Sequence, residues 1–455
     1  MKKPSRKFDL FVASVFPTEV EHVKQNNEIT DPELLSIIDK LHSSVNFPER
    51  EIQFDQNIDP RKYSRIIKYF ETKLQKIDVD AYYAWISKID YQITTDAIPP
   101  EEQQRILREI NAFERGWFHA ASFYRTMQNY KRYLLIRFRE KDYRIVKHFL
   151  DEYEDYYIDN KEIEAKIDEL TSKFIIPETA HSRNIKQTDL DWLLTIFYDP
   201  NISKKNRYQA LVAYNLHHIS TRRITPMLAP MSALEDRLLK GEFYSRRILA
   251  NFYANKLLLR NFEGAHEDAS YCGLQSIKQY TEDYLYYLNN YCSVLMNQNK
   301  FEEVLQRSKD AMIYYKSSQD NSRKVIFMAN YCRCLNNYLD YKKSIRFADR
   351  LIDELGTAIF QYKWHYFFRI YFTALIQVNR HDELLRLERR YKLTQKEELK
   401  GFLPFLKLYI LTAGFLEMQL PQHQFMEALQ LLQPQVDGSK REDLKLLFKE
   451  VLTLV

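Results

Sequence analysis

A forty-residue spacing is the feature that most limits how this chain can fold. The triplets Asn290-Tyr291-Cys292, Asn330-Tyr331-Cys332 and Ile370-Tyr371-Phe372 carry it. A leucine and then a ring-bearing residue follow each triplet, at Leu295 and Phe301, Leu335 and Tyr341, and Leu375 and His381. Asn251-Phe252-Tyr253 begins the same pattern thirty-nine residues earlier. A period of this size is typical of helical hairpins that bury their apolar faces only by stacking on one another.

Scarce glycine supports an all-α fold. The 455 residues include only eight glycines, whereas an average protein has roughly 7%. Few tight turns can form, so few antiparallel sheets are expected. The glycines are also never closer than nine positions, which excludes P-loops and dinucleotide fingerprints, because both need several glycines within a short loop.

Charge, hydropathy and cysteine usage indicate a folded cytoplasmic protein. The net charge of +5 is too near balance for a chain coated by nucleic acid. No stretch approaches eighteen uninterrupted apolar residues, so we expect no membrane span, and we find no export signal. Cys292 and Cys332 suit small buried packing positions, and Cys332 and Cys334 point to different sides of a helix, so no metal site is expected.

Three parts are predicted along the chain. Residues 1–30 form a basic, weakly ordered arm that contains Lys2, Lys3, Arg6 and Lys7. Residues 31–200 form an N-terminal helical domain, with helices that begin at Pro32 and near Pro100. From about 105 to 157 we expect one long helix or two, with Gly116 as a kink or a hairpin. Residues 201–455 form the hairpin stack, and its last helix, 440–454, either caps the open end or binds a partner.

Each unit of the repeat resembles a tetratricopeptide repeat. Tyr291, Tyr331 and Tyr371 match the family's bulky packing position, and Cys292 and Cys332 match its small one. The similarity covers roughly residues 242–395, with a period longer than the family's thirty-four residues. It implies a right-handed α-solenoid of helical hairpins behind the N-terminal helical domain.

That resemblance also implies a peptide-binding groove. In the family, asparagines on the first helices bind the backbone of an extended peptide, and basic residues hold its carboxylates. Amides suit this role because each can donate and accept a hydrogen bond. Alternatively, the same asparagines connect neighbouring helices of the stack. The residues assigned to the groove are Arg247, Asn251, Asn289, Asn290, Asn330, Arg333, Asn337 and Arg369.

A basic segment between residues 123 and 147 is a second candidate interface. Aromatic residues alternate with its cations, an arrangement in which rings stack on bases while arginines hold phosphates. Acidic residues follow from Asp151, so the segment could equally be a solvated face or contact a protein. The residues assigned to this patch are Arg125, Lys131, Arg132, Arg137, Arg139, Arg144 and Lys147.

Catalytic patterns are weak. Arg260 and His266 have the spacing of the HEPN-type ribonuclease signature, but the repeat places Phe262 and Ala265 between them at packing positions of a turn. No other catalytic, metal or cofactor motif is present. We predict a non-catalytic scaffold or adaptor that binds a protein or extended peptide in the groove, for example as an accessory subunit of an enzyme complex. The alternatives are a nucleic-acid-binding protein that uses the basic segment, and a sensor of a peptide or small effector.

Overall fold

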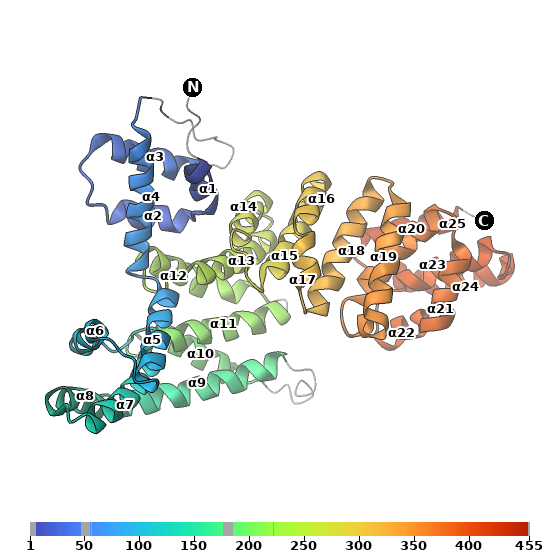
Figure 1. The fold of residues 1–455 in the computed structure, drawn as a ribbon. Coiled ribbons are helices and arrows are strands. Elements are labelled where there is room, and N and C mark those ends of the chain that lie inside the picture. The colour runs from blue at the N-terminus through green and yellow to red at the C-terminus, as the bar shows by residue number, and fades with distance from the viewer. Residues whose placement is uncertain (1–5, 47–54, 56, 176–184, 222, 454–455) are drawn as a thin grey trace. The chain divides into compact units, whose positions relative to one another are not determined.

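The structure is a computed structural model that describes residues 6–46, 55, 57–175, 185–221 and 223–453 (Figure 1). These residues form helices and no strand, which confirms the predicted all-α class. The chain divides into two compact units, Met1–Ala265 (unit 1) and His266–Val455 (unit 2). This division falls inside the predicted repeat region and not at residue 200.

Unit 1 contains the N-terminal helices and ends after the helix that carries Asn251. Its described helices are α1 (Arg6–Ser14), α2 (Pro17–Gln25), α3 (Pro32–Asn46), α4 (Pro60–Gln75), α5 (Val79–Thr94), α6 (Pro100–Asn111), α7 (Ala120–Ile136), α8 (Glu140–Glu152), α9 (Glu154–Ile175), α10 (Gln187–Tyr198), α11 (Lys204–Ser220), the short 3-10 helix η2 (Thr225–Met227), α12 (Leu228–Leu239) and α13 (Arg246–Phe262).

Two of these helices begin where the sequence predicts, and a third has a side-chain cap that was not predicted. Pro32 and Pro100 are the first residues of α3 and α6, a position at which the missing proline N–H removes no helical hydrogen bond. Ser245 caps α13, because its hydroxyl accepts a hydrogen bond from the Ile248 amide at 3.2 Å. Each start therefore follows from local chemistry.

The expectation of a weakly ordered arm at residues 1–30 is corrected for the described residues from Arg6 onward. Lys2 and Lys3 lie outside the described part of the chain. Phe8 and Phe11 of α1 are buried, and their rings lie 4.9 Å from Tyr63 and 5.5 Å from Phe70 of α4, respectively. The apolar residues among the basic ones thus form one face of α1, which packs against α4.

A buried polar cluster joins α2 to α13. The Glu19 carboxylate accepts hydrogen bonds from the Phe16 amide at 2.8 Å, the Tyr244 hydroxyl at 2.6 Å and the Arg246 guanidinium at 2.9 Å. Thr18 and Tyr253 also share a hydrogen bond of 2.9 Å. Because the Glu19 side chain has no solvent exposure, these partners are what make its burial tolerable.

The region from 105 to 157 is neither one helix nor two. It contains the end of α6, all of α7 and α8, and the start of α9. Gly116 lies in the loop between α6 and α7 with a φ of +94°, and a Cβ there would approach the Pro200 carbonyl oxygen to 3.0 Å. Only glycine satisfies both constraints, so this residue marks a turn against α10–α11 and not a kink.

Unit 2 begins with the helix that follows Gly264. Its described helices are α14 (His266–Ser276), α15 (Tyr284–Asn297), α16 (Phe301–Asp310), α17 (Met312–Ser317), α18 (Asn321–Asn337), α19 (Tyr341–Leu355), the 3-10 helix η3 (Gly356–Gln361), α20 (Trp364–Gln377), α21 (His381–Tyr391), α22 (Leu393–Leu399), α23 (Phe405–Leu416), α24 (Gln422–Asp437) and α25 (Glu442–Leu452).

The helices of unit 2 pack in chain order (Figure 1). We call α15, α18, α20 and α23 the first helices of the pairs. Along this series, each first helix contacts the next one. The second helices α16, α19 and α21 contact their own first helix and also the next one. Each of these second helices therefore lies against two first helices, as in a stack of helical hairpins.

One turn geometry recurs at the forty-residue period. Asn299, Leu339 and Asn379 all adopt a left-handed conformation, with φ of +59°, +58° and +57°. In each turn the next amide donates to a leucine carbonyl five residues earlier at 2.9 Å, and the acceptors are Leu295, Leu335 and Leu375. This is the bonding of a Schellman motif, in which glycine is the usual residue. The repeat therefore forms its turns without glycine.

The packing positions of the repeat are buried as predicted. Tyr291, Tyr331 and Tyr371 are almost inaccessible to solvent, as are Cys292 and Cys332. Phe262 is different, because more than half of its surface is exposed. Our assignment of Phe262 to a packing position is therefore wrong, since the α13 helix simply ends there with the ring outside.

Candidate binding surfaces

Two groove asparagines connect neighbouring first helices. Asn289 of α15 donates to the Arg323 carbonyl of α18 at 3.1 Å. Asn330 of α18 accepts a hydrogen bond of 3.1 Å from the Tyr366 hydroxyl of α20. Their exposed fractions are only 3% and 2%. Both amides thus act within the stack.

Three further amide atoms at these positions are also buried. Asn289 Oδ1, Asn290 Nδ2 and Asn330 Nδ2 are buried and have no hydrogen-bond partner among the described residues. A peptide that approaches from solvent would have to separate the helices to reach them. Burial therefore favours the alternative in which these asparagines connect helices.

Arg247 and Asn251 belong to unit 1, whereas the other six groove residues belong to unit 2. Arg247 forms an ion pair of 3.0 Å with Asp80 of α5. Asn251 accepts hydrogen bonds of 3.1 Å from the Tyr208 hydroxyl of α11 and from Asn255. Both side chains thus have partners within unit 1.

Arg369 fastens the last helix of unit 2. Its guanidinium lies 2.7 Å from the Asp443 carboxylate of α25 and 3.4 Å from the centre of the Phe405 ring. Burial would raise the pKa of Asp443, but hydrogen bonds from Arg441 and Arg369 outweigh it and hold that pKa at about 2. Since α25 also packs on α23 and α24, this contact agrees with the capping prediction.

Arg333 and Asn337 are the two exposed members of the predicted groove set that belong to unit 2. Asn337 is the last residue of α18, and the residues forty positions away on either side, Asn297 and Gln377, end α15 and α20. All three carboxamides are exposed and make no hydrogen bond in the described part of the chain. We call Asn297, Asn337 and Gln377 the amide row.

Sequence reasoning found Asn337 but missed its two neighbours. The forty-residue spacing of Asn297, Asn337 and Gln377 was visible in the sequence. Asn297 and Asn337 lie two helical turns after Asn290 and Asn330, and this position along the helix makes them exposed. The family resemblance pointed to Asn290 and Asn330, which lie in a more buried turn.

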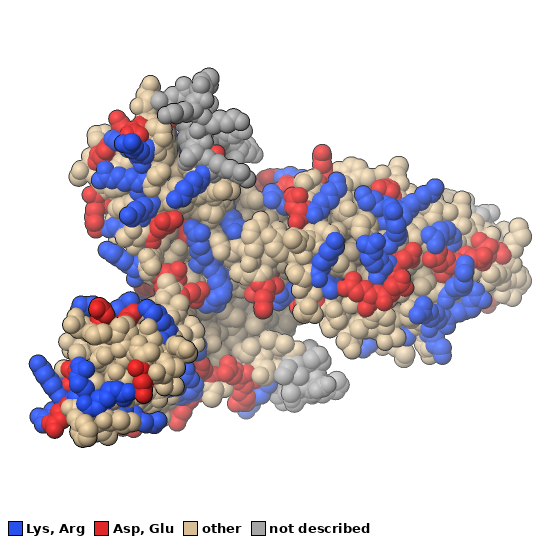
Figure 2. All heavy atoms as spheres, in the orientation of Figure 1, with Lys and Arg blue, Asp and Glu red and all other residues tan. Residues whose placement is uncertain are grey.

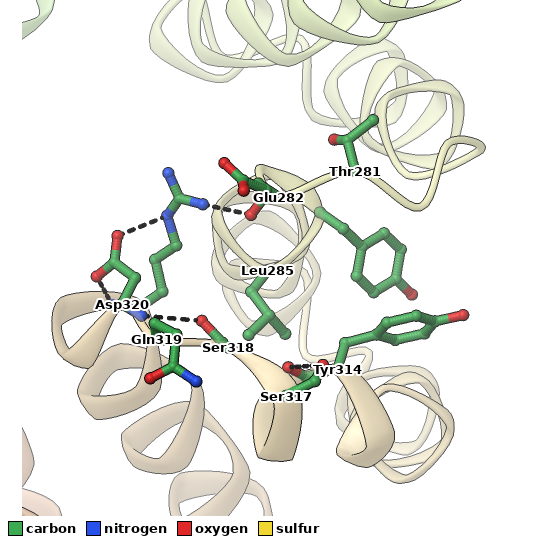
Figure 3. A pocket seen from close by; sticks show the side chains of 10 residues that line it. Thr281, Glu282, Leu285, Tyr314, Ser317, Ser318, Gln319 and Asp320 are labelled. Atoms are coloured by element: carbon green, nitrogen blue, oxygen red, sulfur yellow. Dashed lines mark hydrogen bonds and ion pairs between the residues drawn. The ribbon is translucent and has the colours of Figure 1, made fainter.

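Unit 2 also contains a cavity of about 440 Å³ beside the N-terminal ends of α15 and α18, which we call the tyrosine cavity (Figure 3). Figure 3 shows Asp320 and Tyr314 on opposite sides of it, with Leu285 between them. No part of it was predicted from the sequence. Its walls are formed by Thr281, Glu282, Tyr284, Leu285, Tyr314, Ser317, Ser318, Gln319, Asp320 and Arg323.

The predicted basic segment is a helical hairpin and not one helix. We call it the basic hairpin: α7, the turn Arg137–Arg139, and α8. Basic side chains, with acidic ones among them, cover the lower left of Figure 2, where Figure 1 places α7 and α8. Its buried side, including Phe123, Tyr130 and Phe149, packs with residues of α5 and α6 in one core.

About half of the patch cations are neutralised locally. Arg137 pairs with Asp96 at 2.8 Å and lies over the Tyr133 ring at 3.9 Å. The other ion pairs are Arg139 with Asp142, Arg144 with Glu140, and Lys147 with Asp151. In the described part of the chain, no ion pair is formed by Arg125, Lys131, Arg132 or Lys141.

The tip of the basic hairpin is also apolar, a feature that was not predicted from the sequence. Leu135 and Ile136 are exposed, and Phe138 is 90% exposed with a φ of +55°. A left-handed aromatic residue is unfavourable, although the turn here has the same bonding as the turns of unit 2, with Arg139 N donating to Leu134 O at 3.0 Å.

Reactive groups are sparse in the described residues. Burial raises the pKa of the Cys292, Cys332 and Cys334 thiols to about 12, which makes them poor nucleophiles. Arg260 lies in the last turn of α13 and forms an ion pair with Glu263 at 2.9 Å, whereas His266 begins the next helix. The ribonuclease signature has both residues on one helix, so this geometry does not match it.

The described residues contain no cluster of three or more metal-ligating side chains, and none of their helices has both the length and the apolar character to cross a bilayer. No protein-family model, curated protein or solved structure matches the chain. We therefore base the proposed function on the arrangement of the chain's own residues.

Proposed function

We propose that this chain is a non-catalytic scaffold that binds a protein or an extended peptide along the first helices of unit 2. In this proposal the helix pairs form a right-handed, tetratricopeptide-like solenoid. The observation that carries it is the amide row. Three exposed carboxamides at a constant spacing on successive helices can each donate to and accept from a peptide backbone.

Arg333 adds a charge to the same surface. It is exposed on α18, one helical turn before Asn337, and close enough to Tyr366 to influence the pKa of that phenol, which burial raises and Arg333 lowers. A partner with a carboxylate near its amide-bound backbone would gain an ion pair there. Preformed helices would bind it with little ordering of the receptor.

The test begins with affinity purification from the native host, with and without nuclease, to obtain a protein partner. The triple variant Asn297→Ala, Asn337→Ala, Gln377→Ala should then weaken that partner by about 3 kcal/mol, since each lost amide contact contributes about 1 kcal/mol. Because all three residues are exposed, its thermal unfolding should match the parent chain. Unchanged affinity would refute the amide row as the binding surface.

Asn330→Ala is the matched control. It removes a buried amide and leaves the Tyr366 hydroxyl without its acceptor, which should lower the stability of α18 and α20. Affinity of the folded fraction should stay the same. If Asn330→Ala weakens the partner as much as the triple variant does, the buried asparagines form the groove after all.

A second candidate function uses the basic hairpin to hold an anionic partner, including a nucleic acid. The specific observation is that Arg125, Lys131, Arg132 and Lys141 form no ion pair in the described residues, while Phe138 in the turn of the same hairpin is exposed. The double variant Lys131→Glu, Arg132→Glu should abolish retention on single-stranded RNA, and binding of the parent should fall steeply with salt. Retention that is insensitive to both changes would exclude this role.

A further inference from the structure

The tip of the basic hairpin presents three apolar side chains to solvent. Leu135, Ile136 and Phe138 are 59%, 66% and 90% exposed. Phe138 has a φ of +55°, a conformation that is unfavourable for a bulky residue. Glycine or asparagine would form such a turn more favourably, and a ring this exposed contributes little packing. The turn itself therefore has no need of a phenylalanine, and the ring is free to contact a partner.

Cations lie one helical turn behind these apolar residues. In α7, Lys131 is four positions before Leu135. Arg132 has the same spacing from Ile136. Residues four apart share a helix face, and four residues span about 6 Å of the helix axis. The end of α7 is thus layered, with apolar side chains at the tip and positive charge one turn behind them.

The positive charge of the tip is only partly balanced. Three arginines of the hairpin already pair with carboxylates. Lys131, Arg132 and Lys141 form no ion pair in the described part of the chain. Lys141 lies in the first turn of α8, three positions after Phe138. A partner surface with negative charge would therefore complement these three cations.

An anionic lipid surface fits this arrangement better than a nucleic acid or a protein does. Leucine and isoleucine have no ring on which a base could stack, and protein interfaces are depleted in lysine. Segments that bind membrane surfaces combine Lys and Arg with Leu and Phe, and their apolar side chains enter the head-group boundary by about 5–10 Å. At that depth, cations one helical turn behind the tip would lie among the anionic head groups.

We propose that the tip of the basic hairpin inserts into the surface of an anionic lipid bilayer. The three apolar side chains enter the boundary between head groups and acyl chains, while Lys131, Arg132 and Lys141 contact lipid phosphates. This inference rests on the second candidate function, because it names the anionic partner of the same hairpin. It requires no spanning helix, since the hairpin lies at the membrane surface.

The test is sedimentation of the full chain with vesicles of phosphatidylcholine alone or with about 30% phosphatidylglycerol. Binding is expected to the anionic vesicles only. The double variant Lys131→Glu, Arg132→Glu should weaken it about twentyfold, because each cation near an anionic surface contributes roughly a factor of five. Phe138→Asn should weaken it about tenfold, because an apolar contact is lost, and asparagine tolerates the left-handed turn.

Met418→Asn is the matched control. Met418 has the same φ of +55° and is 93% exposed, at the turn between α23 and α24. No lysine or arginine occurs between Lys407 and Lys440, so this apolar turn has no cations beside it in sequence. The substitution should leave vesicle binding unchanged. If both asparagine variants lose binding equally, exposed apolar turns bind lipid regardless of charge, and the proposal is overturned.

A dye attached at the tip reports insertion directly. The four cysteines of the chain are buried, so a thiol-reactive, environment-sensitive dye added to Phe138→Cys would label mainly position 138. Its emission should shift to the blue with anionic vesicles, because the dye leaves water for the acyl-chain boundary. The same dye on Met418→Cys should not respond.

The remaining outcomes separate this inference from the function on which it rests. Binding to single-stranded RNA without binding to anionic vesicles would overturn the inference and keep the second candidate function, with a nucleic acid as the partner. Vesicle binding that Phe138→Asn leaves unchanged would overturn insertion, since charge alone would then hold the chain at the surface. Binding to neither RNA nor vesicles would overturn both.

Discussion

Units 1 and 2 differ in how far apart in sequence their bonded residues lie. In unit 1, the Arg246–Glu19 pair joins residues 227 positions apart, and Thr18 and Tyr253 are 235 apart. In unit 2, the bonds Asn289–Arg323 and Tyr366–Asn330 join residues only 34 and 36 positions apart. Unit 1 therefore closes its chain on itself, whereas unit 2 adds one helix pair to the next.

This difference predicts two kinds of response to mutation. In a row of pairs, stability is approximately a sum of pair terms and neighbour terms, so damage stays near the altered pair. In a unit closed by contacts between its two ends, damage at the closure spreads to both ends. Because a chain of this size need not unfold in one step, local hydrogen exchange is the suitable measurement for both.

The largest effect is expected for Tyr331→Ala in unit 2. This ring is buried and meets the Phe347 ring at 5.1 Å, so truncation leaves a cavity and should cost about 3–5 kcal/mol. Hydrogen exchange should accelerate mainly in α18 and in the helices that contact it, α15, α16, α19 and α20. Tyr331→Phe keeps the ring and should be nearly neutral. Equal acceleration throughout unit 2 would contradict a sequential row.

Next in size is Glu19→Gln in unit 1. The substitution keeps the shape but leaves the Arg246 guanidinium without its buried counter-ion, and breaking such a pair costs up to about 3–5 kcal/mol. Since Arg246 is partly exposed, we expect about 2–3 kcal/mol. Exchange should accelerate in α1 and α2 and also in α12 and α13. Acceleration confined to α2 would show that the closure does not hold unit 1 together.

A smaller effect is expected at the end of unit 2, where Asp443 is held by Arg369 and Arg441. Its pKa in the folded chain is about 2, below the ordinary 3.8. The interaction of ionised Asp443 with the two arginines therefore stabilises the fold above about pH 4, and this stability is lost as the pH falls toward 2. Because the carboxylate is partly exposed, the contribution is about 1 kcal/mol.

Asp443→Asn tests this. At pH 7 it should accelerate exchange in α25 and α23, and it should remove the acid dependence of α25 between pH 4 and pH 2. If hydrogen exchange in α25 of Asp443→Asn depends on acid as it does in the parent, other carboxylates cause that dependence. Glu442→Gln is the control and should change little, because Glu442, one residue earlier, forms an exposed ion pair with Lys445 at 3.2 Å.

The same difference explains what the sequence could predict. The burial of Tyr331 and the turn after Leu335 depend on residues within one repeat or the next, so a forty-residue pattern contains the information. The burial of Phe8 and Glu19 depends on partners far along the chain, and nothing in the local sequence of a basic N-terminus indicates them.

The candidate sites follow a similar rule. Sequence spacing correctly placed amides on successive helices, but the position of an amide along its helix decides whether it is buried, as Asn330 is, or exposed, as Asn337 is. The tyrosine cavity joins residues from two loops and from the three helices α15, α17 and α18, whose relative packing no single pattern encodes. The charges of the basic hairpin were evident in the sequence, but local pairs such as Arg137 with Asp96 were not.

The smallest effect, and the one that tests the repeat most directly, is a stabilisation by Leu339→Gly. Leu339 adopts φ of +58° at the turn between α18 and α19 and is exposed, so its side chain contributes little packing there. A left-handed conformation lowers the stability of a residue with a Cβ by roughly 1–2 kcal/mol, and glycine avoids this cost. Glycine also has a larger conformational entropy in the unfolded chain, which offsets part of the gain in stability.

We therefore expect Leu339→Gly to stabilise α18 and α19 by about 0.5–1 kcal/mol, measured as slower local hydrogen exchange. Asn299→Gly, at the equivalent turn one repeat earlier, should gain less, because asparagine tolerates the left-handed region better than leucine does. If Leu339→Gly destabilises the pair instead, the leucine side chain has a packing role at this turn, and the repeat depends on contacts between successive turns as well as between helices.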